Sequence, residues 1–133
     1  CGTYSKDKCM RILQIVGLDK SANLKAKKLS LGMKQRLGLA MALATGSDLL
    51  VLDEPMNGLD PDGMMEMRMI LSSLKKKGMT ILISSHLLSE LDKIADVFGF
   101  MHNGQLIKEV KRSETQETLE QIYLQVTKEA QKK

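Results

Sequence analysis

Aromatic residues and long apolar runs are scarce in this sequence. Aromatic side chains make up 3% of the 133 residues, and tryptophan is absent, so there are few platforms on which nucleic-acid bases could stack. The formal net charge of +4 therefore indicates a solvated basic surface, and we expect no nucleic-acid partner. The longest apolar runs, such as LGLAMALA and LLVL, are much shorter than the roughly 20 residues of a membrane-spanning helix, so we expect that the chain does not cross a bilayer by itself.

Cysteine is also rare, and its placement bears on the compartment. Cys1 and Cys9 lie near one end without metal-ligand spacing or a secretory segment, which favours a reducing environment such as the cytoplasm. The chain does not begin with methionine, which we interpret as a sign of processing or excision. Its length and its 43% apolar content suit one globular domain with a real core.

Apolar spacing predicts an α/β fold. A helix is expected over residues 7–17, with Gly17 as its stop. A second helix is expected from the N-cap Ser30 to the stop at Gly46. Their apolar faces are expected to comprise Cys9, Ile12, Leu13 and Val16 in the first, and Met33, Leu37, Ala40, Met41 and Ala44 in the second.

Residues 48–86 have the pattern of a strand, a helix and a strand. Four apolar residues, 49–52, precede two carboxylates and predict a strand buried on both faces. Asp60 as N-cap and Pro61 at the first helical position begin a helix that Gly78 ends, and a second apolar run follows at 80–86. Short connections of this kind require the two strands to be parallel.

The remainder predicts a short helix over 87–95, a hairpin and a last helix. Asn103-Gly104 between two alternating runs is a strong hairpin signal. Ser113 and Gln116 have capping-box spacing at the start of the last helix. Its apolar face is expected to comprise Leu119, Ile122, Tyr123 and Val126.

Polar residues follow both predicted strands, and ligands of parallel sheets bind beyond such strand ends. Asp53 and Glu54 follow the first strand, and Ser85 and His86 follow the second. Since side chains alternate along a strand, Asp53 and Glu54 should point differently, one suited to Mg²⁺ and the other to activating a water. Two simpler alternatives remain open: DEP as an ordinary strand end, and His86 as a structural histidine.

The motifs LSLGM, LLVLDEP, GLD and SSH occur in one order, and together they resemble the ATPase domain of ATP-binding cassette (ABC) proteins. The resemblance runs from about Leu18 to Val110 and is strongest to bacterial exporters of the antibiotic-resistance and lantibiotic type. It implies a partial P-loop NTPase fold of the RecA-like ABC kind. Parallel strands with crossover helices would be followed by a hairpin and a C-terminal helix.

The resemblance also implies roles for residues. Residues 29–33 would be the signature motif, usually LSGGQ, in which Ser30 and Gly32 contact ATP held by a second ABC ATPase domain. Leu31 and Met33 depart from that motif, which puts one side-chain contact in doubt and leaves the motif's role intact.

The other motifs would act at the chain's own half of the site, except the D-loop, which would contact the ATP of the second domain across the dimer. Asp53 would be the magnesium-associated carboxylate, Glu54 the general base, Asp60 the D-loop residue at the dimer interface, and His86 the switch histidine at the γ-phosphate. ATP and Mg²⁺ are thus the implied cofactors. The implied partners are the second ATPase domain and membrane-spanning transporter subunits, which would hold the protein at the inner face of the cell membrane.

One element of that family is missing from the sequence. A P-loop needs G-x-x-x-x-G-K-[ST], and the chain has no Gly-Lys pair. We therefore interpret it as the C-terminal fragment of one ABC ATPase domain. Its parts would be a helical-subdomain remnant (1–47), part of the catalytic core (48–112) and a C-terminal helix (113–133).

Without the P-loop strand, the fragment is expected to close the gap in its sheet, to self-associate through strand edges, or to rearrange the sheet. We expect it to be inactive alone. Two other classes stay open: a soluble ABC ATPase without a transport role, and a non-catalytic interaction module.

Overall fold

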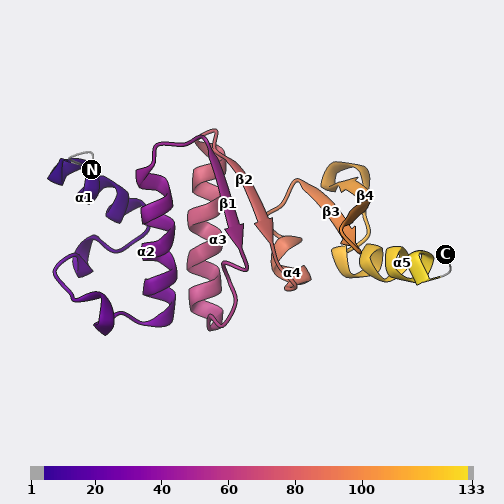
Figure 1. Cartoon of the computed structure of the whole chain (residues 1–133), viewed down its shortest axis with the longest axis horizontal. Coiled ribbons are helices and arrows are strands. Elements are labelled where there is room, and N and C mark those ends of the chain that lie inside the picture. The colour runs from indigo at the N-terminus through magenta and orange to yellow at the C-terminus, as the bar shows by residue number, and fades with distance from the viewer. Residues whose placement is uncertain (1–4, 132–133) are drawn as a thin grey trace. The chain divides into compact units, whose positions relative to one another are not determined.

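The computed structural model describes residues 5–131, so Cys1 lies outside the described range. The chain forms two compact units that divide between Ser85 and His86. The described strands form two separate two-stranded sheets, one in each unit, instead of a single sheet (Figure 1). The functional division expected at residues 47 and 112 differs from this division by compactness and stays a prediction.

The first unit contains the predicted strand–helix–strand pattern. Strand β1 (Leu49–Asp53) pairs in parallel with β2 (Thr80–Ser84), and α3 (Pro61–Lys76) connects them. The side chain of Asp60 caps α3, and Pro61 is its first residue, both as predicted. The α/β class and the parallel pairing are confirmed.

The prediction that β1 is buried on both faces is wrong. Leu50 is 4% exposed, whereas Leu49 and Val51 on the other face are 53% and 64% exposed. Leu82 of β2 is likewise 62% exposed. One face of the sheet is covered and the other is open, because the helices of this unit that contact β1 lie on a single side.

Two helices cover that side. Helix α2 (Leu31–Ala44) and α3 run next to each other (Figure 1), and an ion pair of 3.2 Å joins Arg36 of α2 to Glu66 of α3. Leu39, Leu52 and Met67, from α2, β1 and α3, line one cavity. On α2, Leu39 and Ala40 are buried whereas Met41 is exposed. The buried face of α2 therefore differs from the predicted apolar face at Leu39 and Met41.

Helix α1 (Lys6–Ile15) is held to α2 by Arg36, whose Nη1 donates to the carbonyl oxygens of Val16 and Gly17 at 3.3 and 3.4 Å. Val16 is buried as predicted, but Cys9 is exposed. Two 3-10 turns, Asp19–Ser21 and Ala26–Lys28, connect α1 to α2.

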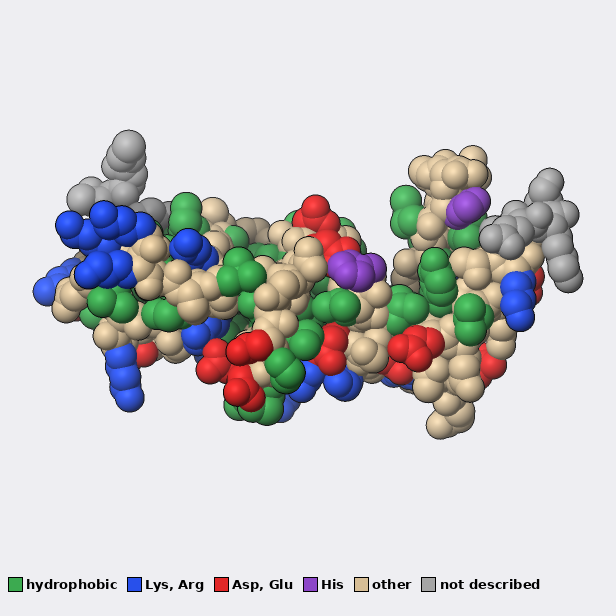
Figure 2. Space-filling view, turned by 90° about the horizontal axis from the view of Figure 1, so that it is seen from below, with side chains coloured by type: hydrophobic (Ala, Val, Ile, Leu, Met, Phe, Trp, Pro, Cys, Tyr) green, Lys and Arg blue, Asp and Glu red, His purple; other side chains and the backbone are tan. Residues whose placement is uncertain are grey.

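Basic side chains gather over this N-terminal region (Figure 2), and they are exposed, as a solvated basic surface requires. The residues are Lys6, Lys8, Arg11, Lys20, Lys25, Lys27 and Lys28. No described helix is both long and apolar enough to span a membrane.

The second unit packs a hairpin on a helix. Strands β3 (Val97–His102) and β4 (Gln105–Lys111) are antiparallel, and Asn103 and Gly104 turn between them with φ of 49° and 77°. Two positive φ values are the signature of the predicted hairpin turn. Helix α5 (Leu119–Gln131) covers one side, and the core comprises Phe98, Phe100, Leu119, Ile122 and Val126.

Two predictions in this unit were wrong at their boundaries. Helix α4 is only Leu88–Leu91 instead of 87–95. The capping box of α5 is Thr118 and Gln121, not Ser113 and Gln116, because residues 112–114 form a 3-10 turn. Gln121 N donates to Thr118 Oγ1 at 3.3 Å, and Thr118 N donates to Gln121 Oε1 at 2.8 Å.

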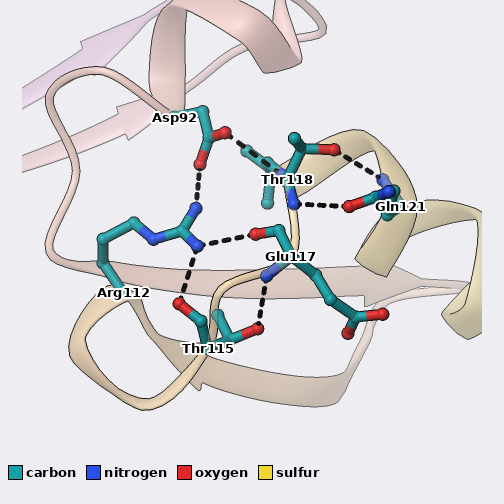
Figure 3. Close-up of polar contacts among 7 residues, drawn as sticks. Asp92, Arg112, Thr115, Glu117, Thr118 and Gln121 are labelled. Atoms are coloured by element: carbon teal, nitrogen blue, oxygen red, sulfur yellow. Dashed lines mark hydrogen bonds and ion pairs between the residues drawn. The ribbon is translucent and has the colours of Figure 1, made fainter.

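An arginine explains where these elements end. Arg112 pairs with Asp92 just after α4, and its Nη2 donates to the carbonyl oxygens of Thr115 and Glu117 (Figure 3). The other carboxylate oxygen of Asp92 accepts from Leu119 N at 3.3 Å. Charge-assisted hydrogen bonds from Arg112 therefore fix the segment between the hairpin and α5, which does not continue as helix. Tyr123, expected in the apolar face, is 44% exposed.

Candidate functional site

Asp53 and Ser84 end the two parallel strands at the same edge of the sheet. They are register partners, and the Ser84 hydroxyl donates a hydrogen bond to Asp53 Oδ1. The Glu54 amide donates to the Ser84 carbonyl at 3.0 Å and lies 3.3 Å from its Oγ. Ser84 thus positions both acidic residues, and the sequence reasoning, which singled out the next two residues, did not identify it.

Glu54 occupies an uncommon backbone conformation. Its φ is 49°, in the left-handed region, where a residue with a Cβ is strained by about 1–2 kcal/mol. Asn57 N donates to the Glu54 carbonyl at 3.1 Å and so closes a turn directly after the strand. Asp53 is exposed and Glu54 is half-buried, with its Oε2 buried, so the adjacent carboxylates have different surroundings.

Asp60 ends this loop by capping α3. Its Oδ1 accepts a hydrogen bond from Gly63 N at 2.8 Å. A Cβ at Gly63 would lie 2.9 Å from the same oxygen, so a larger residue at this position would clash with the capping carboxylate. In this chain, therefore, Asp60 has a structural role whatever else it contacts.

The start of α2 packs on the same loop. Ser30 caps α2, with its Oγ accepting from Met33 N at 3.2 Å, as predicted. A Cβ at Gly58, whose φ is 75°, would lie 3.1 Å from Cδ2 of Leu31. A Cβ at Gly32 would lie 3.6 Å from Cδ2 of Leu59. The structure therefore brings the first turn of α2, the positive end of its helix dipole, to the loop that follows Glu54.

A cavity of about 220 Å³ lies beside the carboxylates. Glu54 and Asp53 contribute to its wall together with the middle of α2 and the start of the loop. The lining residues are Gln35, Gly38, Leu39, Leu52, Asp53, Glu54, Pro55 and Met67. The cavity is large enough for ordered water and has polar walls on one side.

His86 is the first residue of the second unit. Its side chain is exposed, and its carbonyl oxygen accepts from Leu88 N at 3.1 Å, immediately before α4. Five of the six site residues predicted from the sequence thus lie in the first unit, and the strand end, the loop and the start of α2 bring them into one region.

The carboxylates Asp53 and Glu54 are compatible with Mg²⁺ bound by few protein ligands. No group of three or more His, Cys, Asp or Glu side chains that could hold a metal occurs in the described part of the chain. Mg²⁺ often takes only one or two protein carboxylates and completes its shell with water and substrate phosphates. The exposed, hydrogen-bonded Asp53 fits that mode of binding.

A strand ending in paired carboxylates beside a capped helix N-terminus is the arrangement expected of a phosphate-handling α/β domain. Comparison with known proteins specifies the class. The family described as "ABC transporter" matches residues 4–57.

Two curated relatives and one solved structure illustrate the likeness. The chain is 47% identical over 119 residues to the lantibiotic transport ATP-binding protein SrtF of Streptococcus pyogenes, covering 90% of this chain and 52% of that protein. It is 52% identical over 114 residues to the bacitracin transport ATP-binding protein BcrA of Enterococcus faecalis, covering 85% of this chain and 37% of that protein. The ADP conformation of MJ1267, an ATP-binding cassette of an ABC transporter, superposes with a TM-score of 0.79 at 28% identity, over 91% of this chain and 47% of that chain.

The chain is thus similar to ABC transporter ATP-binding proteins over most of its length, and its fold is that of an ABC ATPase domain in part. It spans about half the length of SrtF and a smaller share of BcrA.

Proposed function

We propose that this chain is the C-terminal part of the ATPase subunit of an ABC exporter. The complete subunit would couple ATP hydrolysis to the movement of an antibiotic through membrane-spanning partners, at the inner face of the cell membrane. The observation that carries the proposal is the placement of Asp53 and Glu54 at the end of β1, with the first turn of α2 packed on the loop after them. The names of the relatives, lantibiotic and bacitracin transport proteins, support the substrate class.

The hydrolytic step follows from the two carboxylates. A water oxygen attacks the γ-phosphorus of ATP in line, the bond to the ADP oxygen breaks, and Glu54 takes the proton of the water. Asp53 would hold Mg²⁺ through a water of its shell, and the bound ion would supply positive charge beside the phosphates. His86 donates a hydrogen bond to the γ-phosphate.

Ser30, Gly32 and Asp60 would act across a dimer of ATPase domains. A helix N-terminus carries about half a positive charge, and Gly32 has no side chain to keep a phosphate away. Ser30 accepts a hydrogen bond as a cap and keeps its own hydroxyl proton to donate. These residues would close over ATP bound by the partner domain, with Asp60 at the interface.

The substitution Glu54→Gln tests this function in the complete subunit. We expect ATP binding and a trapped closed dimer, with hydrolysis lower by several orders of magnitude, since an amide cannot take the proton. Glu109→Gln, an exposed change in β4, is the matched control and should hydrolyse ATP normally. Hydrolysis that survives Glu54→Gln would remove this residue from its role.

For the chain by itself, we propose weak or no ATP binding, because it has no Gly-Lys pair to form a P-loop. Isothermal titration with Mg-ATP measures this directly. Micromolar affinity would show that the phosphates are held by some other arrangement.

A further inference from the structure

Gln35 connects α2 to the loop that follows Glu54. Its Nε2 donates a hydrogen bond of 2.9 Å to the carbonyl oxygen of Asn57, which lies 22 residues further along the chain. Side-chain hydrogen bonds commonly go to the backbone, and this one joins a helix to a loop that is distant in sequence.

The loop that it holds is short and turns sharply. Glu54 begins it in the left-handed region, and Asn57 N returns a hydrogen bond to the Glu54 carbonyl at 3.1 Å. Leu59 N donates to Met56 O at 3.3 Å, and Asp60 then caps α3. The carbonyl of Asn57 points to α2, so Gln35 supplies the hydrogen bond that fixes the middle of the turn to a helix.

Gln35 also faces the cavity that the two carboxylates line. Its Oε1 is buried and has no hydrogen-bond partner among the described residues. A buried amide oxygen is ordinarily satisfied, so this atom offers an acceptor to water that enters beside Glu54. One amide group therefore contacts the loop with its nitrogen and faces the cavity with its oxygen.

We propose that Gln35 is a positioning residue for hydrolysis: it fixes the turn after β1 so that the Glu54 carboxylate is held at the orientation needed to activate water. The inference rests on the proposed function. It also links the start of α2, which would face the partner's ATP, to the general base of the chain's own half-site, because Gln35 lies in the second turn of the same helix.

The first experiment needs no activity. In this chain, Gln35→Glu replaces the donor by an acceptor of the same size, and Gln35→Met removes both polar atoms. Hydrogen exchange of the Asn57 and Leu59 amides should become faster by roughly tenfold, the scale of one lost net hydrogen bond, while the Leu50 amide in β1 is unchanged. Gln14→Glu, an exposed glutamine on α1, is the control. Unchanged exchange of the loop, or loss of protection throughout the unit in both variants, would overturn the proposal.

The second experiment measures hydrolysis in the complete subunit. Gln35→Glu and Gln35→Met should lower kcat by roughly 10- to 100-fold, the scale of a displaced catalytic group, with KM for ATP within about twofold of the parent. If Glu54→Gln still hydrolyses ATP, Glu54 is not the general base, and the proposed catalytic assignment fails regardless of Gln35. If Glu54→Gln is inactive and the Gln35 variants keep full kcat, only the positioning role fails.

Discussion

The hydroxyl of Ser84 donates a hydrogen bond to the carboxylate of Asp53 across the parallel pair of strands. The bond joins two residues that are 31 positions apart in sequence and directly opposite in register. It places a neutral donor on the carboxylate that we assign to the magnesium shell. A carboxylate held in this way keeps its orientation when water or phosphate arrives.

The substitution Ser84→Ala is expected to raise the Mg²⁺ concentration needed for half-maximal hydrolysis by roughly 10-fold, since partners of metal-associated groups commonly contribute 10- to 100-fold to affinity. A magnesium titration of ATPase rate in the complete subunit measures this. Ser84→Thr keeps the hydroxyl and should restore the parent behaviour, and Ser73→Ala on the exposed side of α3 is the control. An unaltered magnesium curve for Ser84→Ala would contradict the assignment.

Met67 and Met69 form a matched pair on α3. Met67 is 1% exposed and lines the cavity, whereas Met69 is 66% exposed. Met67→Ala should lower the free energy of unfolding of the first unit by about 2–5 kcal/mol, and Met69→Ala by less than about 0.5 kcal/mol. Denaturant unfolding followed by amide exchange in α3 measures both. Equal losses would mean that α3 packs with another face.

The cap of α5 offers a second matched pair. Thr118→Ala removes the oxygen that accepts from Gln121 N and should cost about 0.5–2 kcal/mol of stability in the second unit. Ser113→Ala, at the cap position that the sequence suggested, should be close to neutral. Denaturant unfolding monitored by circular dichroism compares them, and a larger effect at Ser113 would restore the original boundary.

The open face of the first sheet leads to a prediction about association. Leu49, Val51 and Leu82 are exposed together on two paired strands. Contiguous apolar surface of this kind favours contact between copies, so the chain alone should associate with rising concentration in sedimentation velocity. Val51→Thr combined with Leu82→Thr should reduce association, whereas the same exchange at Leu106 in β4 is the control. A monomer at every concentration would contradict the expectation.

Local signals predicted much of this fold correctly. The caps Ser30 and Asp60, the parallel strands and the Asn103-Gly104 turn each depend on a few neighbouring residues, and each was found. The exposure of β1 could not be read from its four apolar residues, since composition does not say how many layers cover a strand. The cap of α5 was misplaced because Arg112, Asp92 and the backbone of the connecting segment act together across 20 residues.

The site residues likewise divide into those that the sequence identifies and those that only the structure identifies. Asp53, Glu54, Ser30 and Gly32 stand in recognisable motifs, and the structure brings their segments together. Ser84 and Gln35 were missed because neither carries a signal of its own: a serine in a strand and a glutamine in a helix are ordinary. Their partners, Asp53 and Asn57, are distant in sequence, so only the folded chain identifies them.

The left-handed backbone conformation of Glu54 lowers the stability of the fold at the same position where the carboxylate is needed for hydrolysis. Glycine adopts that φ without the cost that a Cβ imposes, about 1–2 kcal/mol, and asparagine adopts it more readily than glutamate. A laboratory screen that rewarded only heat resistance would therefore tend to enrich Glu54→Gly or Glu54→Asn, and each round would discard the carboxylate. Mutant libraries made to select a more thermostable protein should therefore leave Glu54 unchanged.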